Sequence, residues 1–199
     1  MVKLVNQTIF AARIKGKKLP VFTAADIRIL FGLSAGATTK LLHRYASRKF
    51  IVRIKRGLYI LADVSLPELF IAGKLYEPSY VSREFALSYH RVIPETVYEI
   101  TSVTSKATRR FEKIGKVYSY RKIKQSAFAG YEIAKQDGLS FRIADVEKAF
   151  VDANYFRLRD GLKPLSRYNK EKINTAKALH YASFFDNKKF TSIIKTTLK

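Results

Sequence analysis

The sequence predicts an α+β protein of two small domains, and three observations support this fold class. Helix-like and strand-like segments alternate along the chain, with three helical segments before the first strand pair. The 199 residues are 47% hydrophobic and 13% aromatic, which is enough apolar material for a packed core. The formal net charge is +22, and residues 1–65 hold 13 Lys and Arg against two acids. We therefore expect one domain at 1–65 and a second at 66–199.

Three helices are expected before residue 50. Residues 3–14 place apolar side chains such as Ile9 at helical spacing. Thr23 is followed by an acid in the next turn, which is typical of a capped helix, and Gly32 ends that helix. Ser34 is the expected cap of a third helix, whose apolar residues share one face: Ala37, Leu41, Leu42 and Tyr45.

A β-hairpin is expected directly after the third helix. Two apolar-rich runs between residues 50 and 61 flank the sequence Lys55, Arg56 and Gly57, and glycine supplies the positive φ of a tight turn. Three helices followed by a hairpin is the element order of a winged helix-turn-helix domain. The sequence therefore predicts that fold for the N-terminal domain.

The C-terminal domain is expected to be a mixed α/β domain that ends in helices. Ser82 is the expected cap of a helix that turns Phe85, Ala86 and Tyr89 inward. Segments rich in β-branched and aromatic residues indicate strands at 95–104 and 116–123. The remaining elements are a helix at 67–76, a hairpin formed by 127–134 and 139–144, a helix capped by Asp145, and helices at 170–183 and 187–197.

The charge indicates a polyanionic partner, because a large excess of one sign destabilises a compact fold by self-repulsion. Double-stranded DNA fits better than a membrane, since the most basic stretches resemble turns, helix ends and strands. Ala35 and Gly36 are small enough to let the backbone approach a phosphate. The polar face of the third helix and the hairpin tip supply the predicted DNA-binding residues: Thr39, Lys40, His43, Arg44, Arg53, Lys55 and Arg56.

A second concentration of basic residues follows in the C-terminal domain. It is either a further nucleic-acid surface or a solvated strand pair with its loop. The aromatic residues within it, Phe111, Tyr118 and Tyr120, either stack on unpaired bases or pack half-buried in strands. This secondary basic surface consists of Lys106, Arg109, Arg110, Lys113, Lys116, Arg121, Lys122 and Lys124.

The residue content argues against an enzyme and against any metal or cofactor. The chain has no cysteine, its three histidines show no ligand spacing, and no phosphate-binding loop or nucleophile elbow occurs. Lys3 and Arg13 interrupt the apolar start, and no apolar run reaches the roughly 18 residues of a membrane span, so a cytoplasmic protein is expected. The alternative of a magnesium-dependent nuclease would use Glu84, Glu95, Glu99, Asp145, Glu147 and Asp152, which serve more simply as caps and ion-pair partners.

Four segments, 22–61, 74–112, 128–135 and 143–152, resemble the AbiEi-type transcriptional regulators, the antitoxins of type IV toxin–antitoxin systems. The block at 79–111 is the most specific part of that resemblance. The resemblance implies a winged DNA-binding domain that represses its own operon, followed by an antitoxin domain. We expect the DNA partner to be the chain's own promoter, with inverted repeats. The implied partner is a nucleotidyltransferase-like toxin that does not form a stable complex with the antitoxin. The alternative is a stand-alone basic DNA- or RNA-binding regulator without a toxin.

Overall fold

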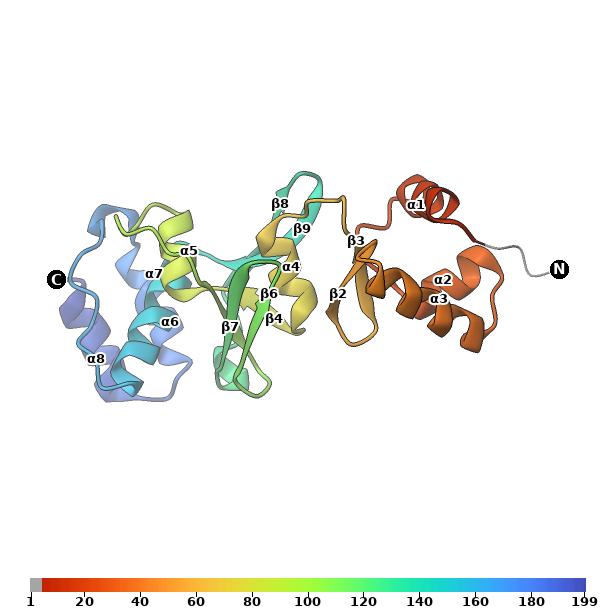
Figure 1. Ribbon diagram of the computed structural model, residues 1–199. Coiled ribbons are helices and arrows are strands. Elements are labelled where there is room, and N and C mark those ends of the chain that lie inside the picture. Colours follow the sequence, from red (N-terminus) through yellow and green to blue (C-terminus); the bar gives the residue numbers. More distant parts are fainter. Residues whose placement is uncertain (1–4) are drawn as a thin grey trace. The chain divides into compact units, whose positions relative to one another are not determined.

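The computed structural model describes residues 5–199, which divide between Leu66 and Pro67 into two compact units. Both units combine helices with β-strands, so the predicted α+β class is confirmed. The first unit contains a three-stranded antiparallel sheet in the order β1-β3-β2. Its elements are α1 (Gln7–Gly16), β1 (Phe22–Thr23), α2 (Ala24–Phe31), α3 (Ala35–Ser47), β2 (Ile51–Lys55) and β3 (Leu58–Leu61) (Figure 1).

The first helix differs from the expectation in its start and in its buried face. It begins after Asn6, whose side chain accepts a hydrogen bond from the amide of Ile9, and the start of the predicted 3–14 segment lies outside the described residues. The buried side chains are Phe10 and Ile14, whereas Ile9 is half exposed. The Phe10 ring contacts several other aromatic rings of the unit at centroid distances of 5.1–6.0 Å. Those tertiary contacts select the face, which the spacing of apolar residues along 3–14 did not distinguish.

The caps of α2 and α3 form as their sequence predicts. The Thr23 hydroxyl accepts from the amide of Asp26 while the Asp26 carboxylate accepts from the amide of Thr23, which completes a capping box. Gly32 ends α2 with φ +64°, in the left-handed region. The Ser34 hydroxyl accepts from the amide of Ala37 at 3.2 Å and starts α3. Residues Thr38, Leu41, Leu42 and Tyr45 form the buried face of α3.

The second unit is built on a six-stranded mixed sheet in the order β6-β7-β5-β4-β9-β8. Strands β5 and β7 are parallel, as are β4 and β9, and the other neighbouring pairs are antiparallel. The sheet strands are β4 (Ser79–Val81), β5 (Ile100–Thr104), β6 (Arg109–Lys113), β7 (Lys116–Lys122), β8 (Tyr131–Gln136) and β9 (Leu139–Ala144). The helices are α4 (Glu68–Leu75), α5 (Arg83–Tyr89), α6 (Val146–Arg159), α7 (Thr175–Ser183) and α8 (Lys188–Thr197), with 3-10 turns at Gln125–Ala127 and Lys170–Lys172.

Helices cover both faces of this sheet. On one face, the hydroxyl of Tyr120 in β7 donates to the carbonyl of Ala72 in α4 at 2.7 Å. On the other face, the hydroxyl of Tyr80 in β4 donates to Asp152 in α6 at 3.0 Å. Tyr118 and Tyr120 are 1% and 0% exposed. The suggestion that these two tyrosines stack on unpaired bases is therefore wrong.

Three local expectations in the second unit are also wrong. Ser82 does not cap α5, because its hydroxyl donates to Asp152 at 2.8 Å, and the inward side of α5 is Ala86 and Leu87 while Tyr89 is exposed. The strand expected at 95–104 begins only at Ile100. The preceding residues stay outside the sheet, and the carbonyl of Glu95 accepts a hydrogen bond from Ser88 of α5 at 2.9 Å.

A buried ion pair lies between α6 and β4. The side chains of Lys148 and Asp152 are both 0% exposed, and the ammonium of Lys148 donates to one carboxylate oxygen of Asp152. The second oxygen accepts from the hydroxyls of Tyr80 and Ser82. Burial raises the pKa of Asp152 above its usual value, against the opposing effects of Lys148, Ser82 and Tyr80. Four polar groups thus satisfy one another inside an apolar core.

We expect Asp152→Ala to lower the free energy of unfolding of the second unit by about 3–5 kcal/mol, because it leaves a buried ammonium without its counter-charge. Denaturant unfolding of the full chain measures this loss. The double variant Lys148→Met, Asp152→Leu removes both charges and should recover most of the stability. A double variant as unstable as Asp152→Ala would show that charge pairing is not the source of the effect.

Candidate nucleic-acid interface

The outer face of α3 carries a group of exposed polar and basic side chains, opposite the buried Leu41 and Tyr45. This exposed α3 face consists of Thr39, Lys40, His43 and Arg44. Within residues 5–199, Lys40, His43 and Arg44 form no ion pair. Their hydrogen-bond donors are therefore available to a partner molecule.

Two members of the exposed α3 face are held in place by their surroundings. The Thr39 hydroxyl donates to the carbonyl of Ala35 at 3.0 Å, so its oxygen remains available as an acceptor. The guanidinium of Arg44 lies 5.5 Å from the ring centre of Tyr45. Tyr45 itself donates to the carbonyl of Val5 at 2.6 Å, and burial raises its pKa. An ordered core residue thus restricts the position of Arg44.

One basic residue of the first unit serves the scaffold of this face. The guanidinium of Arg13 in α1 donates to the carbonyl of Leu30 in α2 at 2.9 Å and lies 5.0 Å from the ring centre of Phe31. These contacts join α1 to the end of α2, from which the Gly32 turn leads into α3. Arg13 therefore stabilises the scaffold, and the positive charge relevant to binding lies elsewhere.

The β2–β3 hairpin presents the other predicted contact residues. Arg53 in β2 and Arg56 in the turn are exposed, whereas Lys55 at the end of β2 is half-buried. The pairing register shifts between Arg53 and Lys55, which is a bulge in the edge strand. Gly57 has φ +78° and closes the turn. The hairpin therefore holds Arg53 and Arg56 in solvent beside a twisted strand.

Sequence reasoning did not include Arg48 and Lys49, which are exposed immediately after α3. Their backbone is ordered, because the amide of Arg48 donates to the carbonyl of Arg44 at 3.1 Å and the amide of Lys49 to that of Ala46 at 3.0 Å. Basic residues that directly follow a predicted helix could have indicated that the exposed basic set continues beyond α3. The exposed basic set of the first unit is thus larger than predicted.

Six members of the secondary basic surface lie on the β6–β7 hairpin, whose side chains alternate between its two faces, while Lys106 precedes β6 and Lys124 follows β7. Lys116 pairs with Glu68 of α4 at 2.9 Å, and Arg121 pairs with Asp160 on the α6 side at 2.7 Å. The ammonium groups of two others donate to backbone carbonyls, Lys106 to Glu77 at 2.6 Å and Lys124 to Phe185 at 2.9 Å. Arg109, Arg110 and Lys122 are exposed, and Lys113 is half-buried.

The carboxylates considered for a nuclease do not form a metal site in the described part of the chain, where no group of three or more His, Cys, Asp or Glu residues could hold an ion. Asp145 caps α6 by accepting the amide of Lys148 at 2.8 Å. Glu147 accepts the amide of Asn174 at 3.0 Å and pairs with Lys177 at 2.8 Å. Among residues 5–199, none of the helices is long and apolar enough to cross a membrane.

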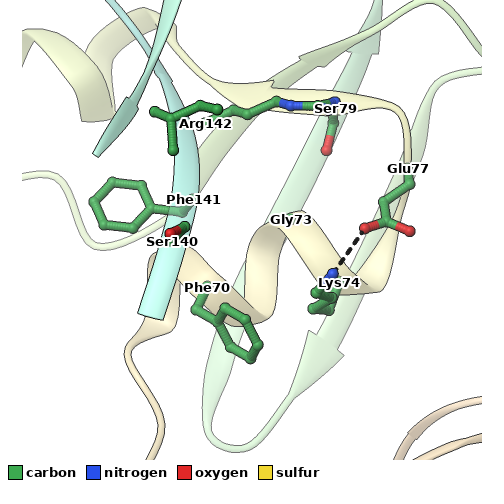
Figure 2. Close-up of a pocket in the computed structure, with 9 residues that line it drawn as sticks. Phe70, Gly73, Lys74, Glu77, Ser79, Ser140, Phe141 and Arg142 are labelled. Carbon is green, nitrogen blue, oxygen red and sulfur yellow. Dashed lines mark hydrogen bonds and ion pairs between the residues drawn. The ribbon is translucent and has the colours of Figure 1, made fainter. Parts of the chain in front are cut away.

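Figure 2 shows a small pocket between α4 and the strands β4 and β9. Its volume is about 160 Å³, and small-molecule sites usually occupy roughly 300–1,000 Å³. Lys74, its nearest ammonium, is paired with Glu77 at 3.3 Å. The pocket is therefore smaller than a typical small-molecule site.

Comparison with known proteins gave one family. Residues 13–62 match the family model described as "Transcriptional regulator, AbiEi antitoxin". The matched segment covers the last turn of α1 and all of the exposed α3 face and the β2–β3 hairpin. A search of curated proteins found no match. The resemblance to the AbiEi regulators is thus confirmed at residues 13–62, while the block at 79–111 lies outside the match.

We expect the two glycines that flank the start of α3 to respond oppositely to alanine. Gly32→Ala should lower the free energy of unfolding by about 1–2 kcal/mol, because alanine is strained at φ +64° although its Cβ would meet no other atom. Gly36→Ala lies in helical backbone with open space around its Cβ and should raise stability by about 0.5–1 kcal/mol. Thermal unfolding of both variants measures the difference; equal effects would contradict the assigned turn.

Proposed function

We propose that this chain, whose residues 13–62 carry the signature of the AbiEi antitoxin regulators, is a transcriptional repressor and antitoxin that reads duplex DNA with α3. The family match supports a DNA-binding regulatory antitoxin. The observation that carries the proposal is the exposed α3 face, where three basic side chains without ion-pair partners in residues 5–199 lie within the matched segment.

The geometry supports a winged helix-turn-helix as the binding unit. Helix α3 follows α2 after a three-residue turn, and the β2–β3 hairpin follows α3 directly. A helix of this kind enters the major groove, where its side chains reach base edges. The hairpin then acts as the wing, with Arg53, Lys55 and Arg56 contacting the phosphate backbone. Gly36 lets the start of α3 approach a phosphate closely.

Double-stranded DNA fits the described surface better as a binding partner than single-stranded nucleic acid does. Binding of unpaired bases relies on exposed aromatic side chains that serve as stacking platforms. Tyr118 and Tyr120 are buried beneath α4 and cannot serve that purpose. The operator we propose is an inverted repeat in the promoter of the chain's own operon, occupied by two copies about one helical turn apart.

We expect Lys40→Ala and Arg44→Ala each to weaken operator binding by about 1–3 kcal/mol while leaving binding to unrelated duplexes less affected, because these side chains read base edges. Arg56→Ala should weaken binding to all sequences alike and make the salt dependence shallower by about one in slope. Footprinting and salt titration of the full chain measure both effects.

Lys188→Ala on α8 is the matched control for these variants, since it removes one exposed charge from the second unit. If about six phosphates are neutralised, log K should fall against log salt with a slope near −5. Equal affinity for operator, unrelated duplex and RNA at physiological salt would contradict a sequence-specific repressor.

The antitoxin half of the proposal concerns a nucleotidyltransferase-like toxin encoded beside this gene. Co-expression of the full chain should relieve the growth arrest that the toxin causes. The double variant Lys40→Ala, Arg44→Ala should still relieve it, because we assign antitoxin activity to the second unit. Growth curves measure rescue, with immunoblots to confirm equal protein levels. A neighbour of another class, or full-chain expression without rescue, would leave only the stand-alone regulator.

A further inference from the structure

The second unit has a polar hollow of about 560 Å³ on the sheet face that faces α5 and α6. It opens beside β5, β7 and β6, the strands at one edge of the sheet. We call it the arginine hollow. Its functional lining is Arg83, Arg110, Arg121, Ser119, Thr101 and Glu99.

The strand register places these groups in adjacent rows. Arg110 of β6 lies opposite Ser119 of β7, and Ser119 lies beside Thr101 of β5. Side chains alternate along a strand, so Arg121 projects from the same face as Ser119. Arg83 reaches the hollow from the start of α5. Arg83, Arg110 and Arg121 therefore line one depression from three different elements, and Arg109 of β6 is a fourth arginine of its lining.

Two of these guanidinium groups are held before any ligand arrives. Those of Arg83 and Arg121 lie 5.3 and 4.9 Å from the ring centre of Phe156, which is fully buried in α6. Arg121 also donates twice to the carboxylate of Asp160, at 2.7 and 2.9 Å, and this hydrogen bonding holds the pKa of Asp160 below its usual value. Fixed guanidinium groups lose little freedom when they bind an anion.

Several donors at the hollow have no partner. The Ser119 hydroxyl and the Nε of Arg83 are buried and form no hydrogen bond with any group in residues 5–199. Ser119 is 9% exposed. The guanidinium of Arg110 lies 3.9 Å from Glu99 and 3.8 Å from Glu112, both beyond hydrogen-bond distance. Buried polar groups are nearly always bonded, so the unpaired Ser119 hydroxyl and Arg83 Nε point to a ligand that supplies acceptors.

The lining selects the chemistry of that ligand. Planar guanidinium groups match phosphate oxygens, and the lining contains four arginines and one carboxylate, that of Glu99. Three further carboxylates lie at its margin, 3.3 Å from Arg83 (Glu84), 3.8 Å from Arg110 (Glu112) and 2.7 Å from Arg121 (Asp160). Its aromatic member, Tyr120, is 0% exposed and offers no surface on which a base could stack. The guanidinium groups line a single hollow, which suits phosphates joined to each other better than the spaced phosphates of a nucleic-acid strand.

We propose that the arginine hollow binds an oligophosphate group, supplied by a nucleoside triphosphate or by free polyphosphate. Arg83 and Arg121 hold one end, Arg110 leaves Glu99 to close on the other, and Ser119 donates to a phosphate oxygen. This proposal does not depend on DNA binding by α3.

Calorimetric titration of the full chain with inorganic tripolyphosphate, ATP and AMP tests the proposal. Tripolyphosphate and ATP should bind with similar affinity, and AMP at least about tenfold more weakly, because it lacks the linked phosphates. Arg110→Ala should weaken tripolyphosphate binding by about tenfold or more, with Arg110→Lys in between. Glu99→Gln should strengthen binding, since it removes the carboxylate that lines the hollow.

Lys122→Ala is the charge-matched control, because this exposed residue belongs to the same hairpin and does not line the hollow. It should bind tripolyphosphate as the unaltered chain does. Unchanged thermal unfolding of Arg110→Ala shows that its loss is local. Equal losses in Lys122→Ala and Arg110→Ala, or no binding of tripolyphosphate, would overturn the proposal. A single-stranded oligonucleotide without terminal phosphates tests the other assignment. If it binds more tightly than ATP, and Arg110→Ala removes that binding, the hollow binds nucleic-acid backbone instead.

Discussion

The buried ion pair of Lys148 and Asp152 is the constraint on which the second unit depends. The two residues are one turn apart on α6, and the carboxylate also accepts from Tyr80 and Ser82. Isolated charges in an apolar interior are unfavourable by several kcal/mol, so each of these groups requires the others. The network specifies one position for α6 against β4, because a shift of α6 would leave a buried charge without a partner.

The position of α6 in turn determines the arginine hollow. Phe156 and Asp160 lie one and two helical turns after Asp152, on the same side of α6 and its C-terminal cap. Through them α6 holds the guanidinium groups of Arg83 and Arg121 above the sheet. An internal charge pair and a surface anion site thus share one helix, and the rigidity of the first supplies the pre-organisation of the second.

The first unit distributes its charge differently. Its described residues contain one ion pair, Lys15 with Asp63, and that pair is exposed. Its core is stabilised by clustered rings, among them Phe10, Phe22 and Tyr45. Most of its basic side chains consequently have no acidic partner and repel one another, a cost that aromatic packing offsets. A bound polyanion that neutralises this surface would increase the stability of the unit, in agreement with the proposed DNA contact.

The sequence by itself determined the features that depend on neighbouring residues. The capping box at Thr23, the left-handed turn at Gly32 and the cap at Asp145 each involve residues within about four positions, so a local pattern predicted them. The tertiary structure decided which face of α1 is buried, why Ser82 bonds to Asp152 instead of capping α5, and how the arginines meet. Those outcomes join residues distant in the sequence, 70 positions apart for Ser82 and Asp152, and only the packed chain brings such groups together.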